Sequence, residues 1–191
     1  MTTRLVPVLI ALALLGAVGG AFGSDEIQID HARLEATEEG YALSADLDFE
    51  LPARLEDALV NGVPLYFLVE FELQRPRWYW RDERIVQSSL RLRLAFHALT
   101  RQYRLSSGTL HQSFSSLEEA LRALSRLRGW PVIERAQVRP GNDYDCFLRV
   151  RLDPSELPRP FQVRAITQRE WSLASSWKRW RFTPAAERSG K

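Results

Sequence analysis

Two segments, LYFLVEFEL at 65–73 and IVQSSLRLRLAF at 85–96, decide the fold of this 191-residue chain. In both segments apolar side chains alternate with polar ones over much of their length. This period of two is typical of an extended strand that has one face in a core and the other in water. The two segments are separated by a short stretch, so we expect them to form an antiparallel hairpin.

The register of this hairpin is predicted from two patterns. If Phe71 faces Leu90, the apolar residues of both strands fall on one side of the sheet. The same register places Glu70 opposite Arg91, where opposed charges contribute roughly 0.2–1 kcal/mol. We therefore expect this pairing, with residues 78–82 at the tip of the hairpin.

The rest of the chain contains further short strand patterns and two segments with helical spacing. The expected strands are 27–29, 42–51, 109–114, 132–138, 144–152 and 161–166, and the expected helices are 53–60 and 117–127. The pattern predicts a mainly β protein, an antiparallel β-sandwich of about eight strands with two short helical insertions. We expect a single domain over 24–184 and a disordered tail at 185–191.

Local signals mark where these elements begin and end. Ser115 and Glu118 form a capping box at the start of the second helix, and Gly129 is expected to end it. Asn61-Gly62 predicts the end of the first helix. The apolar phase slips by one residue at His97, which predicts a turn or a bulge there.

The first 23 residues have the features of a secretory signal peptide. Arg4 precedes an apolar run, Leu5–Val18, and the small residues Ala21 and Gly23 occupy the positions that a signal peptidase reads. The run is short for a transmembrane helix, which needs about 20 residues. We therefore expect export to the periplasm and no membrane span after cleavage; retention of this segment as an anchor is the alternative.

Composition restricts the class of function. The chain has 26 basic and 24 acidic side chains, so a protein that coats a polyanion is not indicated. An exported protein is also not expected to meet nucleic acid. Cys146 is the only cysteine, so no disulfide can form within the chain. It alternates with the apolar residues of 144–152, which predicts a buried side chain rather than a nucleophile.

An aromatic and basic cluster is the most unusual local feature. Trp78, Tyr79, Trp80 and Arg81 occupy the expected hairpin tip, where Gly, Asn or Asp is usual. They could form a surface for a glycan, a lipid headgroup or a protein, or they could cover one end of the core. Outward-facing arginines on the following strand, Arg91 and Arg93, could extend this cluster into a basic face. Pairing of such arginines with glutamates on neighbouring strands is the alternative.

No catalytic or metal-binding motif is present. The three histidines, His31, His97 and His111, have no metal-ligand spacing, and no G-x-S-x-G nucleophile motif occurs. We expect no cofactor, no metal and no enzymatic activity. The alternative is a hydrolase of an envelope glycan or peptide with His97 or His111 as the base, because bulges often redirect a side chain toward a site.

Several longer motifs resemble a known family. They are WYWRDE at 78–83, HALTRQYRL at 97–105, SFSSLEEAL at 113–121, LPRPFQV at 157–163 and SSWKRW at 175–180. Together they resemble domain of unknown function 4390, a family of exported proteobacterial proteins. The resemblance implies a signal peptide, a single domain and no assigned activity, and it suggests a role beside membrane sensor kinases. We therefore expect a non-enzymatic periplasmic binding or adaptor protein.

Overall fold

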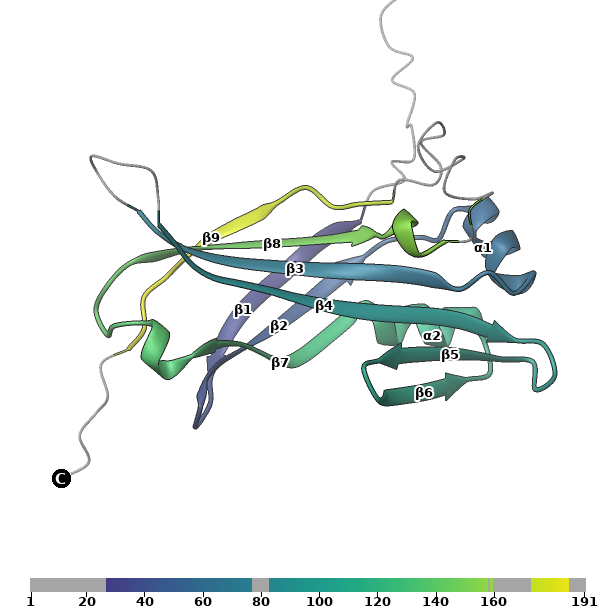
Figure 1. The fold of residues 1–191 in the computed structure, drawn as a ribbon, viewed down its shortest axis with the longest axis horizontal. Coiled ribbons are helices and arrows are strands. Elements are labelled where there is room, and N and C mark those ends of the chain that lie inside the picture. Colours follow the sequence, from purple (N-terminus) through teal and green to yellow (C-terminus); the bar gives the residue numbers. More distant parts are fainter. Residues whose placement is uncertain (1–26, 77–82, 158, 160–172, 186–191) are drawn as a thin grey trace, which may run out of the picture.

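The computed structural model describes residues 27–76, 83–157, 159 and 173–185, and these form a mainly β structure (Figure 1). Nine strands and two α-helices are present in this part of the chain. The strands are β1 (Gln28–Ala36), β2 (Gly40–Asp48), β3 (Leu65–Arg75), β4 (Glu83–His97), β5 (Gln102–Ser107), β6 (Leu110–Phe114), β7 (Arg126–Glu134), β8 (Tyr144–Leu152) and β9 (Lys178–Phe182). The helices are α1 (Ala53–Val60) and α2 (Leu117–Leu124), and two short 3-10 turns, η1 (Arg135–Gln137) and η2 (Pro154–Glu156), precede and follow β8.

The strands form two antiparallel sheets. The larger sheet has the order β6-β5-β4-β3-β8-β9, and the smaller has the order β1-β2-β7. Figure 1 shows the smaller sheet crossing behind the larger one. Strands β4 and β7 approach each other where the Ser88 hydroxyl donates to the Val132 carbonyl at 3.4 Å. The expectation of an antiparallel, sandwich-like β fold with two helices is confirmed.

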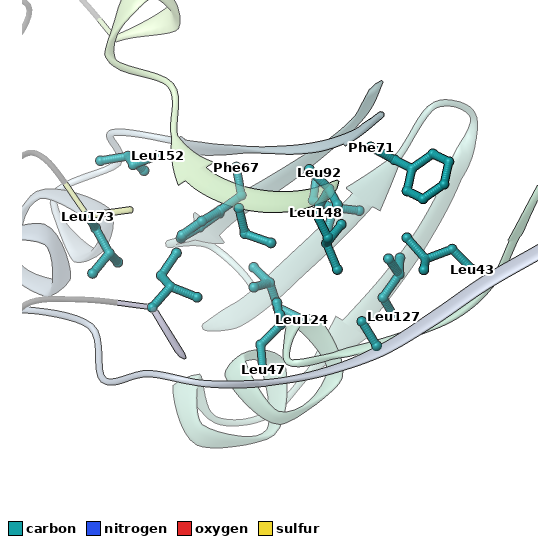
Figure 2. Packing of buried hydrophobic residues seen from close by; sticks show 14 of the residues in the cluster. Leu43, Leu47, Phe67, Phe71, Leu92, Leu124, Leu127, Leu148, Leu152 and Leu173 are labelled. Carbon is teal, nitrogen blue, oxygen red and sulfur yellow. The ribbon is translucent and has the colours of Figure 1, made fainter. Parts of the chain in front are cut away.

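The core lies between the two sheets. Strands β3 and β8 contribute alternate side chains, among them Phe67, Phe71 and Leu148, which have no exposed surface (Figure 2). Leu43 of β2 and Leu124 of α2 meet them from the other side (Figure 2). The period of two in the sequence is therefore the direct cause of this packing. Burial of these side chains supplies the main driving force for folding.

The predicted register of the β3–β4 hairpin is wrong by two residues. Val69, not Phe71, faces Leu90, and Phe71 faces Ser88. A shift of two keeps every side chain on its predicted face, so the alternation alone could not distinguish the two registers. The pairing slips again between Leu73 and Gln74, near the hairpin tip.

The expected cross-strand ion pair is also wrong, as a consequence of the shifted register. Glu70 lies opposite Ser89 rather than Arg91. Its carboxylate instead accepts from Arg151 of β8 at 3.1 Å. Near the hairpin tip, Arg75 forms an ion pair with Glu83.

The two helices form close to where they are predicted. Helix α1 has the expected bounds, and Gly62 follows it with the positive φ of 88° that a left-handed helix end requires. The expected cap of α2 is wrong by one residue, because the Ser116 side chain, rather than that of Ser115, accepts from the Glu119 N–H. Ser115 instead donates to the Glu119 carboxylate and lowers the pKa of that group.

The prediction that Gly129 ends α2 is wrong. The helix stops at Leu124, and Gly129 lies within β7 with a φ of 63°. It donates to the Ser44 hydroxyl at 3.3 Å, at the point where the β2–β7 register shifts. A glycine with positive φ suits a bulge as well as a helix end, and here the bulge is formed.

The expected bounds of the β strands around this point shift accordingly. Strand β7 covers 126–134 instead of the expected 132–138, and β2 covers 40–48 instead of 42–51. Gly40, at the start of β2, packs so closely on β7 that a Cβ there would lie 2.0 Å from the Ile133 carbonyl oxygen. The turn that we expect after His97 is present, and Arg101 in it has a φ of 51°.

Some predictions concern segments outside the described residues. These are the signal peptide at 1–23, the aromatic cluster at 78–81, the strand at 161–166 and most of the tail at 185–191. In the described part of the chain, neither helix is long and apolar enough to cross a membrane.

Candidate anion-binding face

The candidate site is the face of the larger sheet that points away from the smaller one, and we call it the outer face. Alternation places polar side chains there wherever β3, β4, β5 and β8 bury the intervening residues. Arginines are the most frequent residues on it. They are Arg84, Arg91 and Arg93 on β4, Arg104 on β5, Arg149 and Arg151 on β8, and Arg179 and Arg181 on β9.

Around β3 and β8, the outer-face arginines Arg91, Arg151 and Arg179 form ion pairs. Besides the pair between Glu70 and Arg151, Arg179 donates to Asp145 at 2.8 Å. Both carboxylates lie mainly or fully out of solvent, whereas the Arg179 side chain is 61% exposed. Arg91 approaches Glu156 of η2 at 3.2 Å. Of these pairs, only that of Arg151 with Glu70 joins an arginine to a glutamate on a neighbouring strand, which is the alternative expected from the sequence.

The part around β5 is different, because its arginines have no carboxylate partner among the described residues. Arg93 lies opposite Ser106, and Ser106 lies opposite His111 of β6. Arg104 is the next outward-facing residue of β5. Residues directly opposite each other on paired strands have Cβ atoms about 4.5–5.5 Å apart, and diagonal neighbours are about 7–8 Å apart. We call Arg93, Arg104, Ser106 and His111 the arginine–histidine corner.

Two further contacts define the corner. The Arg93 guanidinium lies 6.0 Å from the centre of the Tyr66 ring, which is its only recorded partner in the described structure. The Arg104 Nε atom is buried and has no hydrogen-bond partner among the described residues. The Arg149 Nε is also buried and unpartnered, but its guanidinium lies 5.8 Å from the Trp177 ring. Buried polar atoms without a partner are uncommon in native structures, and here both Arg104 and Arg149 contain one.

Exposed leucines lie at both ends of β5. Leu99, in the turn before β5, is 94% exposed, and Leu110, at the start of β6, is 77% exposed. Leu110 lies opposite Ser107, which lies opposite the buried Leu92, so of the two leucines only Leu99 can lie beside the arginines of the outer face. Guanidinium groups bind phosphate and carboxylate through paired hydrogen bonds, and an exposed leucine adds apolar contact. The arrangement therefore suits an anionic surface with an apolar layer beneath it.

The structure places only part of the predicted site. Arg91 and Arg93 lie on one face, as expected, but Arg91 is ion-paired and Arg93 is not. Trp78, Tyr79, Trp80 and Arg81 lie outside the described residues. Sequence reasoning missed Arg104 and Ser106. The signal that could have found them is the alternation within 102–107, where Tyr103 and Leu105 face inward.

The histidines lie on three different strands, and all three are exposed. His97 ends β4 opposite Gln102, and His31 lies on β1 opposite Asp46. No hydrogen bond between a described group and any of the three imidazoles is present. The hydrolase that uses His97 or His111 as its base stays a prediction.

Cys146 has no exposed surface, which confirms that it is a buried apolar residue. Burial, and to a lesser degree the neighbouring Asp145 carboxylate, raises the pKa of its thiol far above the usual range. The thiol therefore stays protonated and unreactive in the folded protein. Within the described ranges no group of three or more His, Cys, Asp or Glu side chains is arranged to hold a metal ion.

Comparison with known proteins identifies a family. The family described as domain of unknown function DUF4390 matches residues 24–181, and the chain belongs to it. No curated protein and no solved structure matches the chain.

Proposed function

We propose that this protein is a non-enzymatic binding module or adaptor of the bacterial envelope, and that its outer face attaches it to an anionic, phosphate-bearing lipid surface. The observation that carries the proposal is the arginine–histidine corner. Two of its cations, Arg93 and Arg104, have no carboxylate partner in the described structure, whereas Arg151 of β8 and Arg179 of β9 are each paired with one.

The shape and composition of the face support a membrane surface rather than a small ligand. The arginines are spread over several strands of one sheet, and none of the hollows described for this protein includes Arg93 or Arg104. A cation held near an anionic leaflet contributes about 1 kcal/mol. Leu99, in the turn before β5, supplies apolar contact beside these arginines. The residues at 78–81 would add aromatic contacts at the other end of β4.

Vesicle flotation tests the proposal. Protein is mixed with vesicles of phosphatidylcholine alone or with added phosphatidylglycerol, and the bound fraction is measured. We expect binding only to the anionic vesicles, and we expect it to weaken as salt rises. Replacing both Arg93 and Arg104 with Gln should weaken binding about 30-fold, at about 1 kcal/mol for each arginine.

The matched control is Arg151→Gln, since this arginine shares the outer face but is neutralised by Glu70. It should change binding by less than about threefold, a small fraction of the effect of the double variant. Equal binding by the double variant and the unchanged protein would reject the corner as the site. Equal binding to neutral and anionic vesicles would reject the proposed chemistry.

The proposed location is the periplasm, with release after removal of residues 1–23. The apolar segment Leu5–Val18 and the small residues before Ser24 support it. Intact-mass measurement on protein from a periplasmic extract tests it directly, and we expect a chain that begins at Ser24 or within about two residues of it. Full-length protein found only in the membrane fraction would show a retained anchor instead.

A second candidate, an envelope hydrolase, is favoured by one observation, the position of His111 opposite Ser106. A histidine base beside a serine hydroxyl is the arrangement that acyl transfer uses. Chromogenic ester and peptide substrates test this candidate. Activity that is lost in both Ser106→Ala and His111→Ala would support it, and absence of activity in the unchanged protein would reject it.

A further inference from the structure

A second surface, which differs from the outer face in its chemistry, lies along the free edge of β4. Strand β4 pairs with β3 from Glu83 to Leu94, but β5 pairs only with residues 92–97. From Glu83 to Arg91 the other side of β4 therefore has no neighbouring strand among the described residues. Alternate N–H and C=O groups along such an edge are free to pair with a further strand.

The edge borders a groove of about 640 Å³. Its walls are residues 85–88 of β4 and residues 129–134 of β7, and the turn between β1 and β2 closes one end. The apolar part of the lining includes Ile85, Val86 and Val132. A strand added to β4 would direct alternate side chains toward this lining.

Only one of the two edges that meet at the groove is open to pairing. Strand β7 has Gly129 at a positive φ and Pro131, which has no N–H to donate. Both residues are devices that natural sheets use to block edge pairing. Beyond the bulge at Ile85, the β4 segment at 86–91, VQSSLR, pairs regularly with β3 and has neither proline nor glycine. Strand β4 is therefore the edge that can accept a partner.

The charge at the closed end of the groove indicates what the partner carries. Glu38 and Glu39 are exposed, and no cation pairs with them in the described structure. Glu134 also lines the groove, and its carboxylate caps η1. The nearby Arg135 donates to the Thr37 carbonyl, so it offsets only part of this negative charge. Arg84, on the β4 side, is paired with Glu72 at 3.3 Å.

We propose that the β4 edge from Glu83 to Arg91 binds an extended, cationic segment of another polypeptide by strand addition. Main-chain hydrogen bonds to β4 supply the affinity, and apolar side chains of the segment fill the groove. Lysine or arginine side chains at one end of the segment pair with Glu38 and Glu39. This surface is separate from the outer face, so an adaptor could hold a membrane and a polypeptide at once.

Three synthetic peptides of about nine residues, matched to the length of the free edge, test the proposal. The first alternates Val and Thr and ends in two lysines, the second ends in two glutamates, and the third has the lysines and a central proline. Binding of fluorescent peptides is measured by anisotropy with the purified protein. We expect the lysine peptide to bind at least about tenfold more tightly than the glutamate peptide. The proline should abolish binding, because it breaks strand pairing.

Protein variants locate the site. Glu38→Lys with Glu39→Lys should reverse the preference, so that the glutamate peptide binds better. The matched control is Glu50→Lys with Glu56→Lys, two exposed acids outside the groove, and it should leave the preference unchanged. Amide hydrogen exchange should show new protection within 83–91 when the lysine peptide binds. Thermal unfolding confirms that each variant is folded.

Three results would overturn the proposal. The first is absence of binding by the lysine peptide at concentrations up to about 1 mM, because a weaker dissociation constant would not indicate a specific site. The second is equal binding by the proline peptide, which would show that no strand is added. The third is new protection at β6 or β9, the outermost strands of the larger sheet, in place of β4.

Discussion

The two faces of the larger sheet belong to the same strands, but their side chains have different roles. On the inner face, Phe67, Phe71 and Leu148 have no exposed surface and are fixed by packing. On the outer face, the residues between them are partly exposed, and Arg93 and Arg104 have no carboxylate partner in the described structure. The same alternating pattern therefore stabilises the fold through the inner face and leaves these arginines available on the outer face. This difference between the two faces can be tested by changing residues on each of them.

The largest effect is expected from Phe71→Ala. Removing this fully buried ring leaves a cavity, and such changes typically cost about 3–5 kcal/mol of unfolding free energy. Leu68→Ala, on the outer face of the same strand, should cost about 1 kcal/mol. Urea unfolding of both variants measures the difference. Equal losses would show that the two faces do not differ as described.

The next effect is a dependence of stability on pH that comes from Cys146. Burial raises the pKa of this thiol, so the folded state keeps a proton that the unfolded chain releases above the ordinary thiol pKa of about 8.5. The stabilisation is therefore complete below that pH and is lost as pH rises above it. The slope should approach about 1.4 kcal/mol per pH unit.

Urea unfolding between about pH 8 and about pH 11 measures this slope. Cys146→Ala is the control, since other groups titrate equally in both proteins and only the thiol contribution disappears. Identical slopes for the two proteins would contradict the prediction. A thiol reagent should also modify Cys146 only in the unfolded protein.

A smaller effect distinguishes the observed ion pair from the one expected from the sequence. Glu70 and Arg151 are about 70% buried, so a double-mutant cycle should give a coupling of roughly 0.2–1 kcal/mol. The same cycle for Glu70 and Arg91 should give a coupling near zero, because the register separates them. A larger coupling for the second pair would favour the register expected from the sequence.

The smallest effect on stability is expected from the arginine–histidine corner. Replacing both Arg93 and Arg104 with Gln should change the unfolding free energy by no more than about 0.5 kcal/mol. No ion pair with a described residue is lost, and most of the aliphatic part of each side chain is retained. Thermal unfolding measures this value. A loss above about 2 kcal/mol would show that these arginines serve the fold rather than a partner.

The sequence predicts which residues face inward much better than it predicts which strands are neighbours. Alternation assigns Phe67, Val69 and Phe71 to the core, and the structure agrees. A shift of two residues leaves this alternation intact, so the hairpin register needed information from the turn. The pairings of β2 with β7 and of β3 with β8 join distant parts of the chain, and no local pattern announces them.

The same limit explains why only part of the candidate site could be predicted from the sequence. Arg91 and Arg93 are visible as outward residues, but their ion-pairing depends on which strand lies beside them. Glu156, the partner of Arg91, follows β8 and is far away in the sequence. Arg104 could be assigned to the outer face only by following the alternation beyond the turn at His97. Gly129 shows another limit of local patterns. A glycine with positive φ suits a bulge as well as a helix end, so the sequence alone could not say which one forms.

The order in which the strands are joined has a consequence for how the chain reaches this structure. Strand β7 completes the smaller sheet and β8 the centre of the larger one, yet both lie late in the chain. Until they arrive, β2 and β3 each have only a local hairpin partner. Two-state β proteins with such non-local pairing fold on the scale of milliseconds to seconds. A chain of this topology therefore cannot complete either sheet until its second half is present.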